Sequence, residues 1–488
     1  MKRRLVILSV PYLRVTRVLL SPTLLDALGA DADIVVVGPF AAAAEFKAQF
    51  EGRGIDFLEC APRSLLPQPY RFIYALSELM RMFGFWFRHR DAGLGYYWQA
   101  EQIEFGDEGA DRPKSLARRW LQRLTGVIGR SRGAWKLLDR VVARRLYDDP
   151  ALRARMAAAA EITLVQASSW GFQDRMLASL ASRAGARMIL LPYTTDQLWV
   201  NGHLLADYDV VAVQGPFEER CARAYHDVPD ARIEMLGSLW FRTVDSILER
   251  GLVTTDRPAG AARRVLYAGV SRRYFPRESE YLALHALLDA QRDGRLPAFD
   301  LVYRPYAMDE AERRDIEQRV TGIGPIELQW PEDVCAGLDD AAAGLIEPQL
   351  VQYLGRLASA DVVVMSHTTS LGWDAAYLGS GVVANFADPS GVLARRGTQL
   401  RFLPGVGLDC SPQLPVAQEL DELVSLVGRQ LGSREAALSA GRGIVDDWDH
   451  RHPALAEALR AAVFGRGAGP DVRPRLTAPT PAMVGVLS

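Results

Sequence analysis

Hydrophobic residues fall mainly into short apolar runs that alternate with segments of helical periodicity, such as 174–184 and 216–225. Strands buried on both faces of a parallel sheet give such runs. The predicted strands are Arg4–Val10, Ile34–Gly38, Asp56–Glu59, Ile162–Ala167, Met188–Leu191, Val210–Gln214, Arg264–Ala268, Asp300–Arg304, Ile326–Trp330, Asp361–Met365 and Val382–Phe386. The repeated alternation predicts doubly wound, parallel α/β sheets.

These strands are too many for one open sheet, which rarely holds more than about ten. A break at Leu236–Gly237 therefore predicts two facing Rossmann-like domains, an N-terminal domain of residues 1–236 and a C-terminal domain of residues 237–464. A helical insertion of about residues 69–160 separates the third and fourth strands. The tail, residues 465–488, is rich in Gly, Pro, Arg and Thr without periodicity, so we expect it to be disordered.

A hydroxyl-rich segment follows the apolar run 360–365, at the place where open α/β sheets bind their ligands. It leads into a predicted helix, and free amides and hydroxyls at a helix N-terminus bind phosphate. Ser and Thr are also ordinary N-caps, so the pattern alone leaves both interpretations open. The donor-binding residues expected here are Ser366, Thr368, Thr369, Ser370 and Asp374. His367 is a candidate catalytic base.

The stretch from Ser366 to Asp374 resembles the S-D-Y-S-S-x-x-x-D signature of the CDP-glycerol glycerophosphotransferase family, the teichoic-acid polymerases. Three further segments resemble parts of that family: 236–241, 265–273 and 301–306. The resemblance covers about residues 160–390. More loosely, the chain is similar to GT-B glycosyltransferases and to proteins of surface-polysaccharide assembly. The resemblance implies a GT-B-like fold, a nucleotide donor bound by the C-terminal domain, and catalysis without a metal ion.

At two positions the chain departs from that family's motifs, and both departures favour transfer of a sugar over transfer of glycerol phosphate. Tyr306 stands where the family has a histidine after a basic-Pro pair, and the segment 191–196 lacks the family's Gln-His-Gly loop. These differences favour a glycosyltransferase that moves a sugar from a nucleotide-sugar donor to a lipid-linked or polysaccharide acceptor. A CDP-polyol polyolphosphotransferase, a sugar-nucleotide 2-epimerase and a non-catalytic GT-B scaffold remain open as competing functions. No cofactor is expected, and Asp31-Ala-Asp33 precedes a strand rather than following one as a metal motif would.

Basic side chains at other strand ends complete the expected donor site. Arg304 ends one strand, and Arg272 and Arg273 follow another; guanidinium groups pair well with a pyrophosphate. In the N-terminal half, the expected acceptor-binding residues are Arg14, Arg17, Ser169, Trp170 and Tyr193.

Asp196 is the expected general base, because it is the acid nearest a predicted strand end in the N-terminal half. An aspartate that caps a turn fits the same pattern. Asp174 and His203 are the next candidates for this role.

Charge is distributed unevenly along the chain. The whole chain has 57 basic and 59 acidic residues, but residues 112–147 carry eleven Lys or Arg and one acid. Apolar residues alternate with these arginines, and basic amphipathic helices with aromatic residues bind anionic membranes. We therefore expect residues 112–147 to contact an anionic membrane surface; a helical insertion with solvated arginines fits the same pattern. No nucleic-acid-binding motif accompanies the charge.

Cysteine usage and hydropathy predict a cytoplasmic protein. The four cysteines are far apart, with no Cys-x-x-Cys pair, so neither a zinc site nor a disulfide framework is expected. The first apolar run is broken by Pro11 and Arg14, and is interpreted as a strand rather than a signal peptide. Uncharged apolar stretches of about 18 residues are absent from the sequence. We expect a cytoplasmic location, peripheral at the inner face of the cytoplasmic membrane.

Overall fold

The computed structural model describes residues 3–29, 32–41, 43–60, 67–90, 103–104, 112–146, 149–194, 197–198, 201–255, 262–272, 275–307, 309–331, 347–367, 369–392, 414–446 and 449–465. Among the described residues, no helix combines the length and the apolar character needed to cross a bilayer.

The first sheet has seven parallel strands in the order β3-β2-β1-β6-β7-β8-β9. Their bounds are β1 Arg4–Ser9, β2 Ala32–Gly38, β3 Ile55–Glu59, β6 Glu161–Gln166, β7 Arg187–Leu190, β8 Val210–Val213 and β9 Ile233–Met235. Strand β1 pairs on one side with β2 and on the other with β6. The strand order therefore reverses between β1 and β6, and such a switch point is where open α/β sheets bind ligands.

The second sheet has six parallel strands in the order β12-β11-β10-β13-β14-β15. Their bounds are β10 Arg264–Ala268, β11 Asp300–Arg304, β12 Ile326–Leu328, β13 Val362–Ser366, β14 Gly381–Asn385 and β15 Val416–Ala417. Its switch point lies between β10 and β13. The two parallel sheets confirm the predicted fold class. The short strands β9 and β15 were not predicted, whereas β12, which is also short, was.

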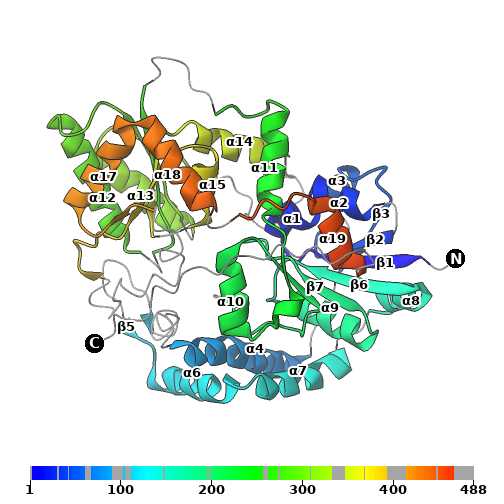
Figure 1. Cartoon of the computed structure of the whole chain (residues 1–488). Helices are drawn as coiled ribbons and strands as arrows, with labels where there is room; N and C mark the ends of the chain where they lie inside the picture. Colours follow the sequence, from blue (N-terminus) through cyan, green and yellow to red (C-terminus); the bar gives the residue numbers. More distant parts are fainter. Residues whose placement is uncertain are drawn as a thin grey trace.

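Helices cover both sheets (Figure 1). Those next to the first sheet in sequence are α1 Thr16–Leu19, α2 Pro22–Leu28, α3 Ala44–Ala48, α9 Phe172–Arg183 and α10 Pro216–His226. Those that follow it are α11 Leu239–Glu249, α12 Arg277–Arg292, α13 Glu310–Ile323, α14 Glu347–Ala358, α15 Ser370–Tyr377, α17 Leu420–Gly432, α18 Arg434–Asp446 and α19 Leu455–Phe464. Two short 3-10 helices are η1 Leu13–Val15 and η5 Asp230–Arg232.

A helical insertion lies between β3 and β6, as the sequence predicts. It consists of α4 Gln68–Arg88, α6 Leu116–Gly129, α7 Arg132–Leu146 and α8 Pro150–Ala158, with a small antiparallel hairpin of β4 Ile103–Glu104 and β5 Arg112–Pro113. Helix α4 lies between the first sheet and the outer pair α6 and α7 (Figure 1). The α4–α6 contact is close, because a Cβ on Gly84 would lie 2.1 Å from the backbone carbonyl of Gly129.

The last helix, α19, returns to the first sheet and packs beside α2 (Figure 1). Leu459 and Val463 are fully buried there, in the same apolar cluster as Val6 and Leu8 of β1. The Thr163 hydroxyl of β6 donates a hydrogen bond to the carbonyl of Val463 at 3.1 Å. The division of the chain at 236/237 stays a prediction, but residues 455–464 pack against the first of the two segments.

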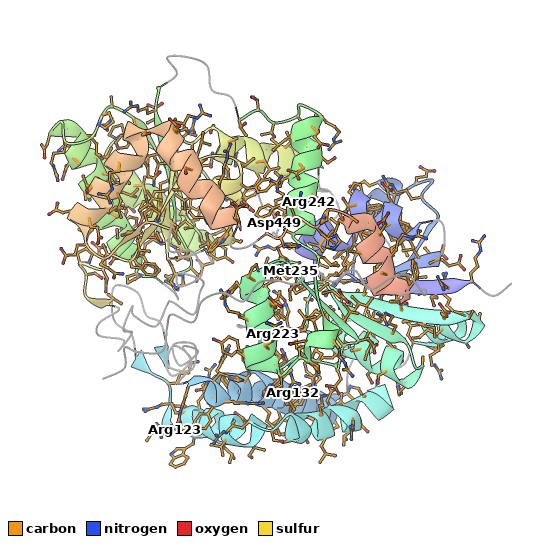
Figure 2. All side chains as sticks on the ribbon, viewed as in Figure 1. Arg123, Arg132, Arg223, Met235, Arg242 and Asp449 are labelled. Atoms are coloured by element: carbon orange, nitrogen blue, oxygen red, sulfur yellow. The ribbon has the colours of Figure 1, made fainter. Side chains whose placement is uncertain are left out.

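The outgoing and returning connections between the sheets lie side by side (Figure 2). Asp449 accepts hydrogen bonds from the Ser238 backbone N–H at 2.7 Å and from Arg242 at 2.5 Å. Gly237 has a φ of +82°, and a Cβ there would lie 2.0 Å from the carbonyl oxygen of His450. The glycine therefore permits both the turn and the close approach of the two connections.

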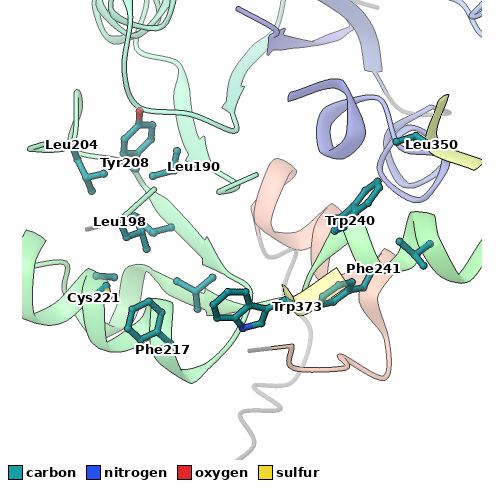
Figure 3. Close-up of a cluster of buried hydrophobic side chains, with 14 of the residues drawn as sticks. Leu190, Leu198, Leu204, Tyr208, Phe217, Cys221, Trp240, Phe241, Leu350 and Trp373 are labelled. Atoms are coloured by element: carbon teal, nitrogen blue, oxygen red, sulfur yellow. The ribbon is translucent and has the colours of Figure 1, made fainter. Parts of the chain in front are cut away.

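An apolar cluster continues across the junction between the two sheets (Figure 3). It includes Leu190 and Phe217 beside the first sheet, and Trp240, Phe241 and Trp373 beside the second. The ring of Phe241 also stacks on that of Tyr377, with centroids 4.2 Å apart. Hydrophobic burial thus fixes the two sheets relative to each other.

Candidate functional site

The chain turns sharply where β13 ends. His367 has a φ of +65°, in the left-handed region that few residues other than glycine adopt. Its backbone N–H donates to the carbonyl of Asn385, at the end of β14, at 3.0 Å, and its buried ring lies 5.5 Å from that of Phe386. Sparsely populated backbone conformations of this kind are concentrated at functional sites. The turn brings the N-terminus of α15 to the carboxyl edge of the second sheet.

The predicted phosphate-binding hydroxyls are placed unequally at this edge. Ser366 is fully buried and donates to the Tyr267 hydroxyl at 2.9 Å. Thr369 is the N-cap residue of α15, and Ser370, the first residue of the helix, is exposed. Thr368 lies outside the described residues. Of the described three, Thr369 and Ser370 are therefore the ones that reach the surface.

Asp374 is held by two aromatic side chains from different helices. Its Oδ1 accepts from Trp240 Nε1 at 2.7 Å, and its Oδ2 accepts from the Tyr353 hydroxyl at 2.6 Å. Burial raises the pKa of Asp374 to about 6, although both hydrogen bonds oppose the rise. A ligand hydroxyl could use only the remaining lone pairs of this carboxylate.

Two arginines lie against the ring of Tyr353, the residue that donates a hydrogen bond to Asp374. Arg304, at the end of β11, lies 5.7 Å from the Tyr353 ring centroid and donates to the Trp330 carbonyl at 3.4 Å. Arg17 of α1 reaches across the junction, 5.8 Å from the Tyr353 ring and 4.9 Å from the Trp240 ring. Arg17, predicted on the acceptor side, thus contacts rings of the C-terminal half. The structure gathers Arg17, Arg304 and Asp374 around one tyrosine.

In the N-terminal half of the chain, three aromatic rings meet at the carboxyl edge of the first sheet. Tyr12 lies 5.6 Å from Trp170 and 5.5 Å from Tyr193 between ring centroids, and its hydroxyl accepts from Trp170 Nε1 at 2.7 Å. Trp170 is 42% exposed. The sequence predicted Trp170 and Tyr193 but not Tyr12, although Tyr12 also follows a strand. We call Tyr12, Trp170 and Tyr193 the aromatic cluster.

Asp174 lies beneath the aromatic cluster and does not reach solvent. Its carboxylate accepts hydrogen bonds from Ser9 at 2.7 Å, from Gln166 at 3.1 Å and from Ser168. Burial raises the pKa of Asp174 to about 7, although these hydrogen bonds oppose the rise. The carboxylate therefore ties together the ends of β1 and β6, which is a positioning role.

A buried charged network connects the helical insertion to the same loop. Arg81 of α4 donates to Glu78 at 2.6 Å and to the Ser169 carbonyl at 3.1 Å. Arg175 of α9 donates to Glu78 at 2.8 Å and to Asp139 of α7 at 2.5 Å. Burial would raise the pKa of Glu78, but the two guanidinium groups lower it to about 2. This Arg81–Glu78–Arg175–Asp139 network fixes the loop that carries Trp170.

The other predicted residues are not brought into these groups. Arg14 is exposed in η1, and Arg272 is half-buried after β10. Asp196 and Arg273 lie outside the described residues. His203, a further candidate base, is buried with Nε2 3.2 Å from the Gly129 carbonyl, and burial lowers its pKa to about 2. Its ring thus belongs to the contact between the insertion and the first sheet.

Comparison with solved structures identifies the architecture. A putative UDP-N-acetylglucosamine 2-epimerase from Listeria monocytogenes has a TM-score of 0.51 at 9% identity, over 95% of this chain and 96% of that chain. The chain has a GT-B-like fold. The UDP-GlcNAc 2-epimerase from Neisseria meningitidis bound to UDP-GlcNAc has a TM-score of 0.49 at 8% identity, over 95% of this chain and 98% of that chain. UGT89C1 from Arabidopsis thaliana, complexed with UDP, has a TM-score of 0.46 at 11% identity, over 95% of this chain and 100% of that chain.

Sequence comparison adds no family. No protein-family model matches the chain, and no curated protein matches it in sequence. At identities near 10%, a shared structure shows the fold alone. The likeness to CDP-glycerol glycerophosphotransferases therefore stays a resemblance in short motifs.

Proposed function

We propose that this chain is a glycosyltransferase that moves a sugar from a nucleotide-sugar donor to a lipid-linked or polysaccharide acceptor in the cytoplasm, without a metal cofactor. The observation that carries the proposal is the grouping of Arg17, Arg304 and Asp374 around Tyr353, between two parallel sheets. Cationic groups at the carboxyl edge of such a sheet suit a negatively charged leaving group.

On the donor side, the leaving nucleoside diphosphate gains negative charge as the glycosidic bond breaks. In this proposal Arg304 and the amides at the N-terminus of α15 stabilise that charge, together with Arg272 and Arg273. Ser370 and Thr369 donate to the phosphate oxygens, with Thr368 beside them. Ser366 and Asp374 hold the strand end and the helix in place through Tyr267, Tyr353 and Trp240.

On the acceptor side, the aromatic cluster supports a sugar ring, with Trp170 as the exposed contact. The acceptor hydroxyl oxygen forms a bond to the anomeric carbon while the bond from that carbon to the diphosphate breaks. The hydroxyl proton passes to a carboxylate or imidazole base, for which Asp196 and His367 are the candidates. Arg14, exposed in η1, is a further acceptor-binding candidate, whereas Ser169 is buried and acts through the loop that carries Trp170.

Donor turnover tests the proposal directly. Pure protein is incubated with a panel of nucleotide sugars and CDP-polyols, and released nucleotide is measured by chromatography. We expect release from a nucleotide sugar, and a loss of roughly a hundredfold in Arg304→Ala, because one group that stabilises the leaving charge is removed. Arg292→Ala, an exposed arginine at the end of α12, is the matched control. Normal turnover in Arg304→Ala, or no turnover of any donor, would contradict the proposal.

Sugar-nucleotide 2-epimerisation is the second candidate. It is considered because a putative UDP-N-acetylglucosamine 2-epimerase from Listeria monocytogenes shares the fold. An epimerase would convert the sugar nucleotide to its epimer in the absence of any acceptor, which nuclear magnetic resonance detects. Release of nucleotide from CDP-polyols alone would instead indicate polyolphosphate transfer. Saturable binding without release would indicate a non-catalytic scaffold.

A further inference from the structure

Helix α6 packs with its small and polar residues inward and its large apolar residues outward. The buried positions are Gln122, Thr125, Gly126 and Gly129. The exposed positions are Leu116, Trp120, Leu121, Leu124, Val127 and Ile128, which are 45–71% exposed. A surface helix of a globular domain normally shows the opposite arrangement. The close glycine contact with α4 fixes this orientation, because the helix could not turn over without bringing bulky side chains against α4.

Helix α7 extends the exposed surface. Leu137 and Val141, one helical turn apart, are 62% and 46% exposed, and α6 and α7 lie along the same side of α4 (Figure 1). We call the eight exposed side chains of the two helices the apolar face. Of the large hydrophobic side chains that are exposed in the described part of the chain, eight lie on this face and four lie elsewhere. A contiguous patch of this kind marks an interaction surface.

Arginines run along one edge of the apolar face. At 100° per residue, Arg119, Arg123 and Arg130 lie on neighbouring positions of α6, between its apolar arc and its buried side. Arg123 projects from the outer side of the insertion (Figure 2). The one acid in residues 112–147, Asp139, pairs with Arg175. The rim of the face is therefore positive.

We propose that α6 and α7 dock this protein on an anionic lipid bilayer. The apolar face lies at the boundary between headgroups and acyl chains, and the arginines lie beside lipid phosphates. A tryptophan among apolar residues and a basic edge is the composition of helices that lie in this interface. The aromatic residues Tyr74, Phe85 and Trp86 of α4 are buried in the core and do not belong to the docking surface. Docking goes beyond the proposed reaction and does not depend on it.

Charge favours the bilayer over two other occupants. A second copy on the same face would add a second set of arginines to the interface, while the one acid of residues 112–147, Asp139, already pairs with Arg175. The tail, residues 465–488, carries Arg466, Arg473 and Arg475 against one acid, Asp471. The tail therefore has no net negative charge to complement the basic edge. Anionic headgroups supply both the charge and an apolar layer.

Co-sedimentation with vesicles tests the docking surface. Full-length protein without nucleotide is pelleted with vesicles of phosphatidylcholine alone, and of phosphatidylcholine mixed with phosphatidylglycerol. We expect the wild type to bind the anionic vesicles. The double substitution Trp120→Asp with Leu124→Asp should weaken this binding at least about tenfold, because neither position then buries apolar area in the bilayer. Arg123→Gln with Arg130→Gln weakens binding by roughly tenfold or more. Leu252→Asp, at an exposed leucine that follows α11 and lies outside the apolar face, is the matched control and keeps full binding.

Each remaining outcome overturns the inference. Wild-type protein that pellets with neither vesicle does not dock on lipid. Binding that survives Trp120→Asp with Leu124→Asp uses another surface. A dimer in sedimentation velocity that this double variant converts to a monomer, without vesicle binding, assigns the face to a second copy. Thermal unfolding of every variant is measured beside the wild type, and the substituted side chains are exposed, so loss of folding is separated from loss of docking.

Discussion

Asp174 sits where two strands of the first sheet end, without access to water. Because burial raises its pKa to about 7, the native protein keeps a proton that the unfolded chain loses above its ordinary pKa of about 4. The unfolded chain then binds fewer protons, so stability falls as the pH rises through this window. Above about pH 7, the native state carries a buried negative charge.

Asp174→Asn removes this titration. The substitution disturbs the hydrogen bonds from Ser9 and Ser168, so the variant is less stable at low pH. We expect its disadvantage to shrink by about 2–3 kcal/mol from about pH 5 to about pH 8, because only the wild type ionises. Urea unfolding of both proteins across this range gives the difference. Asp374 titrates in both proteins, so its contribution cancels in the difference between their free energies of unfolding. A difference that is constant with pH would show that Asp174 does not titrate in this range.

Sequence reasoning at this scale identified residues by their distance from a strand end. It reached Arg304, His367 and Trp170 in this way, because an apolar run is a local pattern. Of the three partners of Asp174, Gln166 and Ser168 are near it in sequence, but Ser9 is 165 positions away. Contacts of that kind depend on which strands become neighbours. Tyr12 also follows a strand, but its contacts with Trp170 and Tyr193 depend in the same way on which strands become neighbours.

At the scale of elements, the Arg81–Glu78–Arg175–Asp139 network joins α4, α7 and α9. Glu78 accepts from both arginines, and both guanidinium groups are fully buried. Glu78→Gln would leave two buried cations with one acid between them. We expect a loss of about 3–5 kcal/mol in the free energy of unfolding, since removing one partner of a buried pair leaves uncompensated charge.

Chemical denaturation measures this loss, with Glu310→Gln as the matched control. Glu310 pairs with Arg313 on an exposed surface of α13, and such pairs contribute about 0–1 kcal/mol. Equal effects of the two substitutions would mean that the buried network does not stabilise the fold. The loop at Ser169 should also become more sensitive to proteases in Glu78→Gln, since Arg81 holds its carbonyl.

Periodicity predicted most strands within one or two residues and the presence of a helical insertion. It did not predict which side of α6 faces the protein, because both an inward and an outward apolar face give the same pattern. A glycine decides the question: the buried side of α6 carries Gly129, whose backbone lies against Met80 and Gly84 of α4. Three-dimensional packing was needed to separate core residues such as Trp86 from exposed ones such as Trp120.

At the scale of the whole molecule, α19 completes the first sheet from the far end of the chain. Removal of residues 455–488 would expose the apolar surface covered by Leu459 and Val463. We expect a loss of several kcal/mol in the stability of the first sheet, given about 1.5–3 kcal/mol for each buried aliphatic side chain. Limited proteolysis and thermal unfolding measure the effect.

The shorter truncation, which removes only residues 466–488, is the control for this experiment. We expect it to unfold like the full chain, in keeping with the prediction that the tail is disordered. If both truncations behave like the full chain, α19 adds nothing to the first sheet. If proteolysis of the longer truncation begins in the second sheet, the helix stabilises the junction instead.

The return of α19 also has a consequence for synthesis on the ribosome. Domains generally fold as they emerge, N-terminal first. Here the first sheet is translated before the second, yet residues that cover it follow the second sheet in the chain. The second sheet emerges whole before that helix does. The first half of the chain would therefore reach its final form only after the second sheet and α19 have been synthesised.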